Sequence, residues 1–140
     1  MASAAYDFNE ALIEDLRAHG GKASSGPFVD RPVLILTAAG ARTGERRTVP
    51  LVYSRDGDRY VVVASKGGAP AHPAWYGNVV ANPTVTVEVD GETFEARATA
   101  LAGGPERDRL YAQHAVPMPA FLEYQRKTER VIPVVVLERI

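Results

Sequence analysis

The sequence has no cysteine, a single tryptophan and no long apolar run. Without cysteine, the chain can form no disulfide framework, thiolate nucleophile or cysteine-ligated metal site. Its three histidines are far apart and accompany no HExxH spacing, so we expect no metal site. No stretch approaches the roughly 20 apolar residues that span a bilayer, and the N-terminus lacks the layout of a signal peptide. We therefore expect a cytoplasmic protein.

The charges nearly cancel, since 16 basic and 17 acidic residues give a formal net charge of −1. This balance provides no general attraction to nucleic acid or to an anionic membrane, so any anion site must be local. A chain of 140 residues has the usual size of one domain. We expect a single domain over residues 1–140, in which residues 1–28 form an N-terminal helix followed by a flexible linker at 20–27.

The first helix carries an apolar stripe of Phe8, Leu12, Ile13 and Leu16. Packing against the rest of the domain is favoured over membrane contact, because an interfacial helix is usually rich in Lys and Arg on its polar face. Membrane contact through this helix stays open as the alternative.

Short strands and hairpin turns dominate the rest of the chain. We expect strands at 33–37, 49–54, 60–64, 84–89, 93–101 and 132–138. Hairpin turns are expected at Asp56-Gly57 and Asp90-Gly91. Helices are expected from Pro73, in a first helical turn, to Asn82 and over 105–114, with a short helical or irregular piece at 119–127. The pattern predicts a mainly β fold of antiparallel strands with flanking helices.

Residues 64–83, ASKGGAPAHPAWYGNVVANP, indicate a ligand cradle. Lys66 and the two glycines after it follow an apolar strand, where the backbone can turn sharply and place an ammonium group beside an anion. His72, Trp75 and Asn78 then recur at three-residue spacing along one edge of a helix. Each part also has an ordinary interpretation, as a solvated turn, a surface histidine and a core tryptophan.

A second basic segment, residues 40–50, reads GARTGERRTVP. Its arginines and threonines are expected in a loop between two strands, where guanidinium groups can bind phosphate or carboxylate bidentately. The residues concerned are Arg42, Thr43, Arg46, Arg47 and Thr48. Solvation or salt bridges to neighbours such as Glu45 are the alternative. No GxGxxG or Walker-type pattern is present, which disfavours a Rossmann or P-loop site.

These two segments, together with LRAHGGKASSGPF at 16–28 and IPVVVLE at 132–138, resemble the deazaflavin-dependent nitroreductase family over nearly the whole chain. The resemblance implies an FMN-binding-like split β-barrel that binds coenzyme F420, an 8-hydroxy-5-deazaflavin, and transfers hydride from its reduced form to small organic acceptors. It maps Arg42 and Arg47 onto basic positions for the cofactor tail and leaves Arg46 as an addition. The expected cofactor-binding residues are Arg42, Thr43, Arg47, Thr48, Val49, Pro50, Ala64, Ser65, Lys66, Gly67, Ala74, Trp75 and Asn78.

Nitroimidazole-reducing members of that family carry a YPxYxxY arrangement where this chain reads MPAFLEY, residues 118–124. Only the last tyrosine remains. We expect Met118, Phe121 and Tyr124 to contact the substrate and Tyr124 to be the proton donor, with simple packing of Tyr124 as the alternative. The apolar replacements favour quinones and unsaturated lactones, such as coumarins or aflatoxins, over nitro compounds.

Three functions stay open at this point. The first is an F420H2-dependent reductase of small-molecule acceptors, acting as a monomer or weak homodimer. The second is an FMN-dependent oxidoreductase of the pyridoxamine-phosphate-oxidase-like type, and the third is a noncatalytic binder of deazaflavin, flavin or lipid. A tightly held flavin would colour the purified protein yellow, and turnover of reduced deazaflavin would distinguish an enzyme from a carrier.

Overall fold

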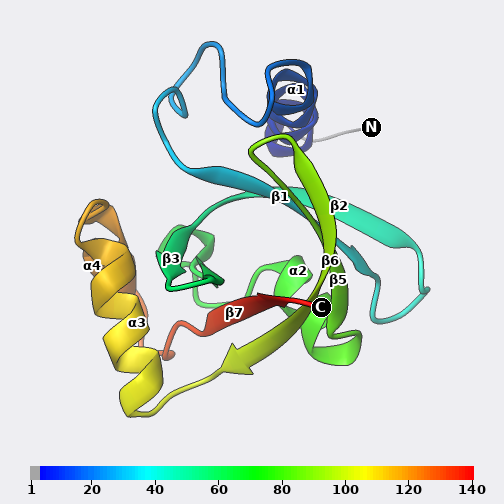
Figure 1. Cartoon of the computed structure of the whole chain (residues 1–140). Coiled ribbons are helices and arrows are strands. Elements are labelled where there is room, and N and C mark those ends of the chain that lie inside the picture. The colour runs from blue at the N-terminus through cyan, green and yellow to red at the C-terminus, as the bar shows by residue number, and fades with distance from the viewer. Residues whose placement is uncertain (1–3) are drawn as a thin grey trace.

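The computed structural model describes the backbone of residues 4–140 and the side chains from Phe8 onward. Within these residues, helices flank a single curled sheet (Figure 1). The helices are α1 (Ala4–Ala18), α2 (Ala74–Ala81), α3 (Pro105–Ala115) and α4 (Ala120–Arg126), with a short 3-10 turn, η1 (Lys66–Gly68). The strands are β1 (Val33–Ala39), β2 (Arg46–Val52), β3 (Ser54–Asp56), β4 (Arg59–Val63), β5 (Thr84–Val89), β6 (Glu92–Leu101) and β7 (Val134–Arg139).

The strand order explains why the sheet closes. Every neighbouring pair is antiparallel, in the order β2-β1-β5-β6-β7-β4-β3. β2 and β3 lie at opposite ends of this order, yet only Tyr53 separates them in the sequence. The chain can pass between the two edges in one residue only if the sheet curls until they meet. The predicted antiparallel split β-barrel is confirmed.

Two tight hairpins build most of this sheet. In the β5–β6 hairpin, Val89 pairs with Glu92, and the turn residues Asp90 and Gly91 have φ values of 51° and 81°. Two consecutive left-handed residues are what a type I′ turn requires. The β3–β4 turn lies one residue later than predicted, at positions 57 and 58, because Asp56 already pairs with Arg59 in the ladder.

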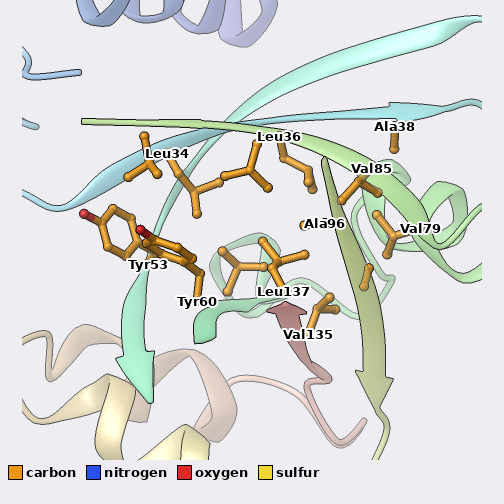
Figure 2. Close-up of a cluster of buried hydrophobic side chains, with 14 of the residues drawn as sticks. Leu34, Leu36, Ala38, Tyr53, Tyr60, Val79, Val85, Ala96, Val135 and Leu137 are labelled. Atoms are coloured by element: carbon orange, nitrogen blue, oxygen red, sulfur yellow. The ribbon is translucent and has the colours of Figure 1, made fainter. Parts of the chain in front are cut away.

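Side chains alternate across β1 and so divide the core into an inside and an outside. Leu34, Leu36 and Ala38 point into the barrel, where they meet residues of β5, β6 and β7 (Figure 2). Val33 and Ile35 point outward and pack against the apolar stripe of α1, with Leu12, Ile13 and Leu16 buried there. A third cluster buries Leu110 and Tyr111 of α3 against β4 and β7. None of the described helices is long and apolar enough to cross a membrane.

The segment predicted as a linker is held by α1 and by the β5–β6 turn. The backbone N–H and the hydroxyl of Ser24 both donate to the Asp15 carboxylate, which lowers the pKa of Asp15. Gly21 has a φ of +94°, and a Cβ on it would lie 2.7 Å from the backbone nitrogen of Asp90. Only glycine fits this approach.

Two local predictions are wrong. Arg46, Arg47 and Thr48 are on β2 instead of in a loop, because the ladder with β1 continues to the Ala39–Arg46 pair. The connection is therefore only residues 40–45, closed by a hydrogen bond from the Gly40 N–H to the Glu45 carbonyl at 2.7 Å. Pro73 is the N-cap residue of α2, with ψ at 152°, and not part of the first helical turn.

Candidate functional site

A cleft of about 690 Å³ opens between β1, β2, η1 and α2. Its size is within the range of small-molecule sites, roughly 300–1,000 Å³. The structure brings together here the predicted residues Thr43, Arg47, Val49, Lys66, Ala74, Trp75 and Asn78. Asn9 of α1, Leu36, Ala38, Gly40 and Pro73 complete the lining, and none of these five was predicted. The two basic segments, separate in the sequence, thus form one site.

Strand alternation decides which residues of β2 face this cleft. Arg47 and Val49 do, together with Leu36 and Ala38 of β1. Thr48 and Pro50 lie on the other face, where the Thr48 hydroxyl is 3.1 Å from the Thr37 hydroxyl. Arg46 also leaves the cleft, since its Nη2 donates to the Thr86 hydroxyl at 2.8 Å. Arg42 is exposed on the 40–45 connection and does not line the cleft.

The cleft joins an apolar wall to two cationic groups. Leu36, Ala38, Val49 and Trp75 supply the wall. Arg47 forms an exposed ion pair with Glu45, Nη2 to Oε2 at 3.0 Å, and such pairs are weak enough for an anionic ligand to replace. Lys66 is exposed. A flat conjugated ring carrying an anionic tail, as in F420, fits this combination of surfaces.

The turn that carries Lys66 is left-handed at three consecutive residues. Lys66, Gly67 and Gly68 have φ values of 47°, 63° and 85°. The conformation costs a lysine about 1–2 kcal/mol, and strain of this kind is common where a side chain is presented to a ligand. Ala64 and Ser65 are buried at the start of the turn and support it through their backbone. They do not line the cleft, and neither does Gly67, above which nothing lies within 4 Å of an added Cβ.

Asn78 connects α2 to the 40–45 connection. Its Oδ1 accepts a hydrogen bond from the Ala41 N–H at 3.0 Å, and Asn82 donates from Nδ2 to the Ala39 carbonyl at 3.1 Å. With Oδ1 bound to the backbone, the Nδ2 of Asn78 is the group that can donate to a ligand. His72 does not line the cleft. It precedes α2, and its ring lies 4.7 Å from the ring of Tyr76.

The predicted substrate residues meet in a second hollow, a groove of about 390 Å³. Met118, Phe121 and Tyr124 line it with Pro27, Phe28, Arg31, Val52, Pro117, Pro119 and Ala120. Met118 is only 6% exposed, whereas Phe121 and Tyr124 are half-buried, with ring centroids 5.2 Å apart. The elements that carry the two hollows pack on each other, since η1, which carries Lys66, contacts α4, and a Cβ on Gly68 would lie 2.7 Å from the Tyr124 carbonyl.

A buried histidine, to which the sequence analysis gave no role, supports this groove. His114 of α3 is fully buried, and its Nδ1 lies 2.7 Å from the Ser54 hydroxyl. Its Nε2 has no hydrogen-bond partner among the described residues, and its ring stands edge-on to Phe121 with centroids 4.5 Å apart. Burial lowers the pKa of His114 to about 4, so the ring is neutral near pH 7.

Arg130 is the second residue that the sequence analysis missed. Its guanidinium donates to the carbonyls of Ser65 and Ala69, each at 2.9 Å, on the two sides of the Lys66 turn. Only the pairing of β7 with β4 could have indicated that Arg130 lies near the Lys66 turn. Because β7 pairs with β4, residues just before β7 lie beside residues just after β4. That pairing was itself not predicted.

The comparisons with known proteins agree with this fold and identify the family. The sequence pattern of the F420H(2)-dependent quinone reductase family matches residues 12–139. An F420H(2)-dependent quinone reductase of Mycobacterium tuberculosis is 43% identical over 110 residues, which is 77% of this chain and 74% of that protein. The solved F420-H2 dependent reductase FDR-A has a TM-score of 0.71 at 42% identity and covers 77% of this chain and 95% of its own.

Two further solved structures extend the comparison. A domain-swapped dimer is 37% identical, with a TM-score of 0.73 over 96% of this chain and all of its own. The heme storage protein HutZ from Vibrio cholerae has a TM-score of 0.60 at 16% identity, over 94% of this chain and 89% of its own, and shares the fold alone.

The fold and the family match together define a split-barrel oxidoreductase that uses coenzyme F420. The chain belongs to the F420H(2)-dependent quinone reductase family. The predicted family resemblance, enzymatic role and cofactor are confirmed, and the flavin and carrier alternatives are set aside.

Proposed function

We propose that this enzyme reduces quinones, with F420 in the cleft of Arg47, Lys66 and Trp75 and the acceptor in the groove of Phe121 and Tyr124. The observation that carries this proposal is the packing of η1 on α4, closest at Gly68 and Tyr124, which places the turn carrying Lys66 of the cleft beside the helix carrying Tyr124 of the groove. Donor and acceptor atoms must come within about 3–3.5 Å for transfer, so an acceptor held in the groove has to reach past this packing contact to the cofactor ring. Bound F420, in its reduced form, supplies the hydride.

In the cleft, the chain's contribution is to bind and orient the cofactor. Arg47 and Lys66 bind its phosphate and carboxylate groups, because charge-assisted hydrogen bonds are the strongest that side chains form. Trp75, Val49 and Ala74 pack along the ring. The amide of Asn78 and the hydroxyl of Thr43 hydrogen-bond its polar edge.

The other predicted cofactor residues act from outside the cleft lining. We place Arg42 at the outer end of the anionic tail, where an exposed arginine on the 40–45 connection reaches solvent-facing carboxylates. Thr48 and Pro50 act through the shape of β2. Ala64, Ser65 and Gly67 supply the backbone that presents Lys66.

In the groove, apolar side chains hold the acceptor and Tyr124 supplies a proton. A quinone that receives a hydride becomes a hydroquinone anion and needs one proton to become the hydroquinone. The phenol of Tyr124 lines the groove and donates this proton, which solvent then replaces because the side chain is half-exposed. Unsaturated lactones such as coumarins and aflatoxins present a similar flat, conjugated carbonyl, whereas a nitro group gains no hydroxyl partner from Met118 or Phe121.

We also propose a cytoplasmic, single-domain enzyme that acts as a monomer or weak homodimer on a small-molecule acceptor, without nucleic acid. β1 and β7 come from opposite ends of the chain and belong to one sheet, which supports a single domain. Sedimentation at several protein concentrations tests the assembly state.

The experiment that tests the function titrates the purified protein with F420 and, separately, with FMN. It then follows anaerobic oxidation of F420H2 by a menaquinone analogue, a coumarin and a bicyclic nitroimidazole. We expect preferential F420 binding and fastest turnover with the quinone or the coumarin. Failure to bind F420 would contradict the proposal that the cleft is the cofactor site. Binding of F420 without turnover of either the quinone or the coumarin would contradict the proposal that the groove is the acceptor site.

A further inference from the structure

We propose that Arg130 is a positioning residue for cofactor binding, which holds residues 64–72 in the conformation that presents Lys66 to F420. The proposal rests on the role of the cleft given above. Arg130 itself does not line the cleft, so it acts through the turn.

One guanidinium group reaches four acceptors in this segment. Nη2 donates to the Ala64 carbonyl at 3.3 Å and to the Ser65 carbonyl at 2.9 Å. Nε donates to the Ala69 carbonyl at 2.9 Å, and Nη1, which can only donate, lies 3.0 Å from His72 Nδ1. All three nitrogens of the group are therefore used, and the contacts extend from the end of β4 almost to α2.

The turn between these contacts is strained and has few bonds of its own. It is closed by the Gly68 N–H on the Ser65 carbonyl at 3.0 Å and the Ala69 N–H on the Lys66 carbonyl at 3.1 Å. Lys66 is in the left-handed region, which disfavours any residue with a Cβ. Arg130 binds the carbonyls on both sides of this turn and so offsets its tendency to relax.

The charge of Arg130 has no carboxylate beside it in the described part of the chain. Its partners there are three carbonyl oxygens and the Nδ1 atom of His72. Burial lowers the pKa of Arg130, as expected for a cation removed from water without an ion pair. The positive charge of Arg130, which is bonded to the backbone on both sides of Lys66, also favours the binding of an anion at Lys66. Arg126, on the neighbouring helix, instead forms an exposed ion pair with Glu123.

The test compares Arg130→Met and Arg130→Lys with the control Arg126→Met, which removes the same charge without touching the turn. We expect Arg130→Met to raise the F420 dissociation constant at least about tenfold, Arg130→Lys to recover part of the loss and Arg126→Met to change it less than about twofold. The KM for F420H2 should rise more than kcat falls, because the role is in binding.

A double-mutant cycle with Lys66→Ala shows whether Arg130 acts through Lys66. We expect Arg130→Met to cost no more than about threefold in the Lys66→Ala background. Equal losses in both backgrounds would overturn the proposal. Arg130→Lys provides the same comparison if the methionine variant does not fold.

Amide hydrogen exchange of the cofactor-free protein gives a readout independent of F420. The N–H groups of Gly68 and Ala69 should exchange faster in Arg130→Met than in the unaltered protein, and equal rates would overturn the positioning role. If the unaltered protein binds no F420, the proposed function fails while this measurement still decides whether Arg130 holds the turn.

Discussion

The cleft proposed for the cofactor and the groove proposed for the acceptor differ in how they are built. The cleft combines residues of β1 and β2 with a strained turn and α2. Asn78 accepts a hydrogen bond from the Ala41 N–H and Asn82 donates one to the Ala39 carbonyl, which join the α2 segment to the end of β1 and the 40–45 connection. The groove is formed mainly by α4 and the residues just before it, against Phe28 and Val52. α4 is only seven residues long and buries none of its side chains fully.

This difference fits a division of roles in which the cleft determines cofactor binding and the groove determines acceptor selectivity. A cofactor shared by a family needs fixed charges and a rigid wall, which strands and backbone hydrogen bonds provide. Acceptors vary, and a short helix with half-buried apolar side chains can change its residues at little cost to the fold. Substitutions in the cleft should therefore affect cofactor binding, and those in the groove should affect the choice of acceptor.

The largest expected effect comes from breaking the packing of η1 on α4, the two elements that carry Lys66 of the cleft and Tyr124 of the groove. Gly68→Ala would place a Cβ 2.7 Å from the Tyr124 carbonyl and 3.1 Å from the Tyr124 Cα, at a φ of +85°. Strain of the left-handed backbone and the clash together should cost about 3 kcal/mol or more of unfolding free energy. Urea denaturation of the cofactor-free protein measures this loss.

Gly67→Ala is the matched control for this change. Gly67 is also left-handed, with a φ of +63°, but nothing lies within 4 Å of its added Cβ. Only the backbone cost of about 1–2 kcal/mol should remain. Equal losses at both positions would mean that the approach of η1 to α4 is not what requires glycine.

The next effect is a pH dependence of the unfolding free energy that arises from His114, the buried residue behind the groove. The pKa of His114 is about 4 in the folded protein, below the ordinary value near 6.5. The unfolded chain therefore takes up this proton first, and stability falls by about 3 kcal/mol as the pH decreases from 6.5 to 4. In His114→Gln, urea denaturation between pH 7 and pH 4 should show a smaller decrease.

The ion pairs of Asp56 make the unfolding free energy depend on pH in a separate, lower pH range. Arg109 and Arg59 lower the pKa of Asp56 to about 2, so its contribution to stability is present above pH 4 and is lost between about pH 4 and pH 2. Both His114→Gln and the unaltered protein should show that lower transition. An unchanged profile between pH 6.5 and 4 in the variant would contradict the role of His114.

The sequence predicted the cleft better than it predicted the supports of either site. Lys66, Trp75 and Asn78 lie within one short segment, where local turn and helix signals suffice. The prediction that Arg46 and Thr48 lie in a loop, based on their polar character, is wrong because the β1–β2 ladder continues through them to the Ala39–Arg46 pair. The roles of Arg130 and His114 depend on partners about 60 residues away in the chain, and no local pattern specifies such contacts.

Smaller effects are expected for the charges in the cleft. If Lys66 and Arg47 each form the proposed charged hydrogen bond to the cofactor, Lys66→Ala and Arg47→Ala should each weaken F420 binding by about 1.5–3 kcal/mol. Arg46→Ala is the matched control, since its side chain bonds Thr86 on the other face of β2. Fluorescence titration measures the dissociation constants. If Arg46→Ala weakens binding as much as Arg47→Ala, the assignment of faces fails.

The smallest effect concerns acceptor choice in the groove. Without hydroxyls at Met118 and Phe121, the unaltered enzyme should oxidise F420H2 with a higher kcat/KM for a menaquinone analogue or a coumarin than for a bicyclic nitroimidazole. Phe121→Tyr adds one donor, worth about 1 kcal/mol to a nitro group, and should narrow this gap about fivefold. Phe121 is the better site for the change, because Met118 is buried and a tyrosine there would overpack the core.

Leu122→Tyr is the control for Phe121→Tyr, because it adds a hydroxyl to α4 outside the groove. Leu122 is exposed and does not line the groove, so a tyrosine there should leave the ratio of the two kcat/KM values unchanged. Steady-state kinetics with both acceptors measures this ratio for each variant. If the unaltered enzyme prefers the nitroimidazole, the apolar groove does not select the acceptor, although Lys66 and Arg47 would still bind the cofactor. A preference for the quinone that Phe121→Tyr weakens and Leu122→Tyr leaves intact would place acceptor choice in the groove.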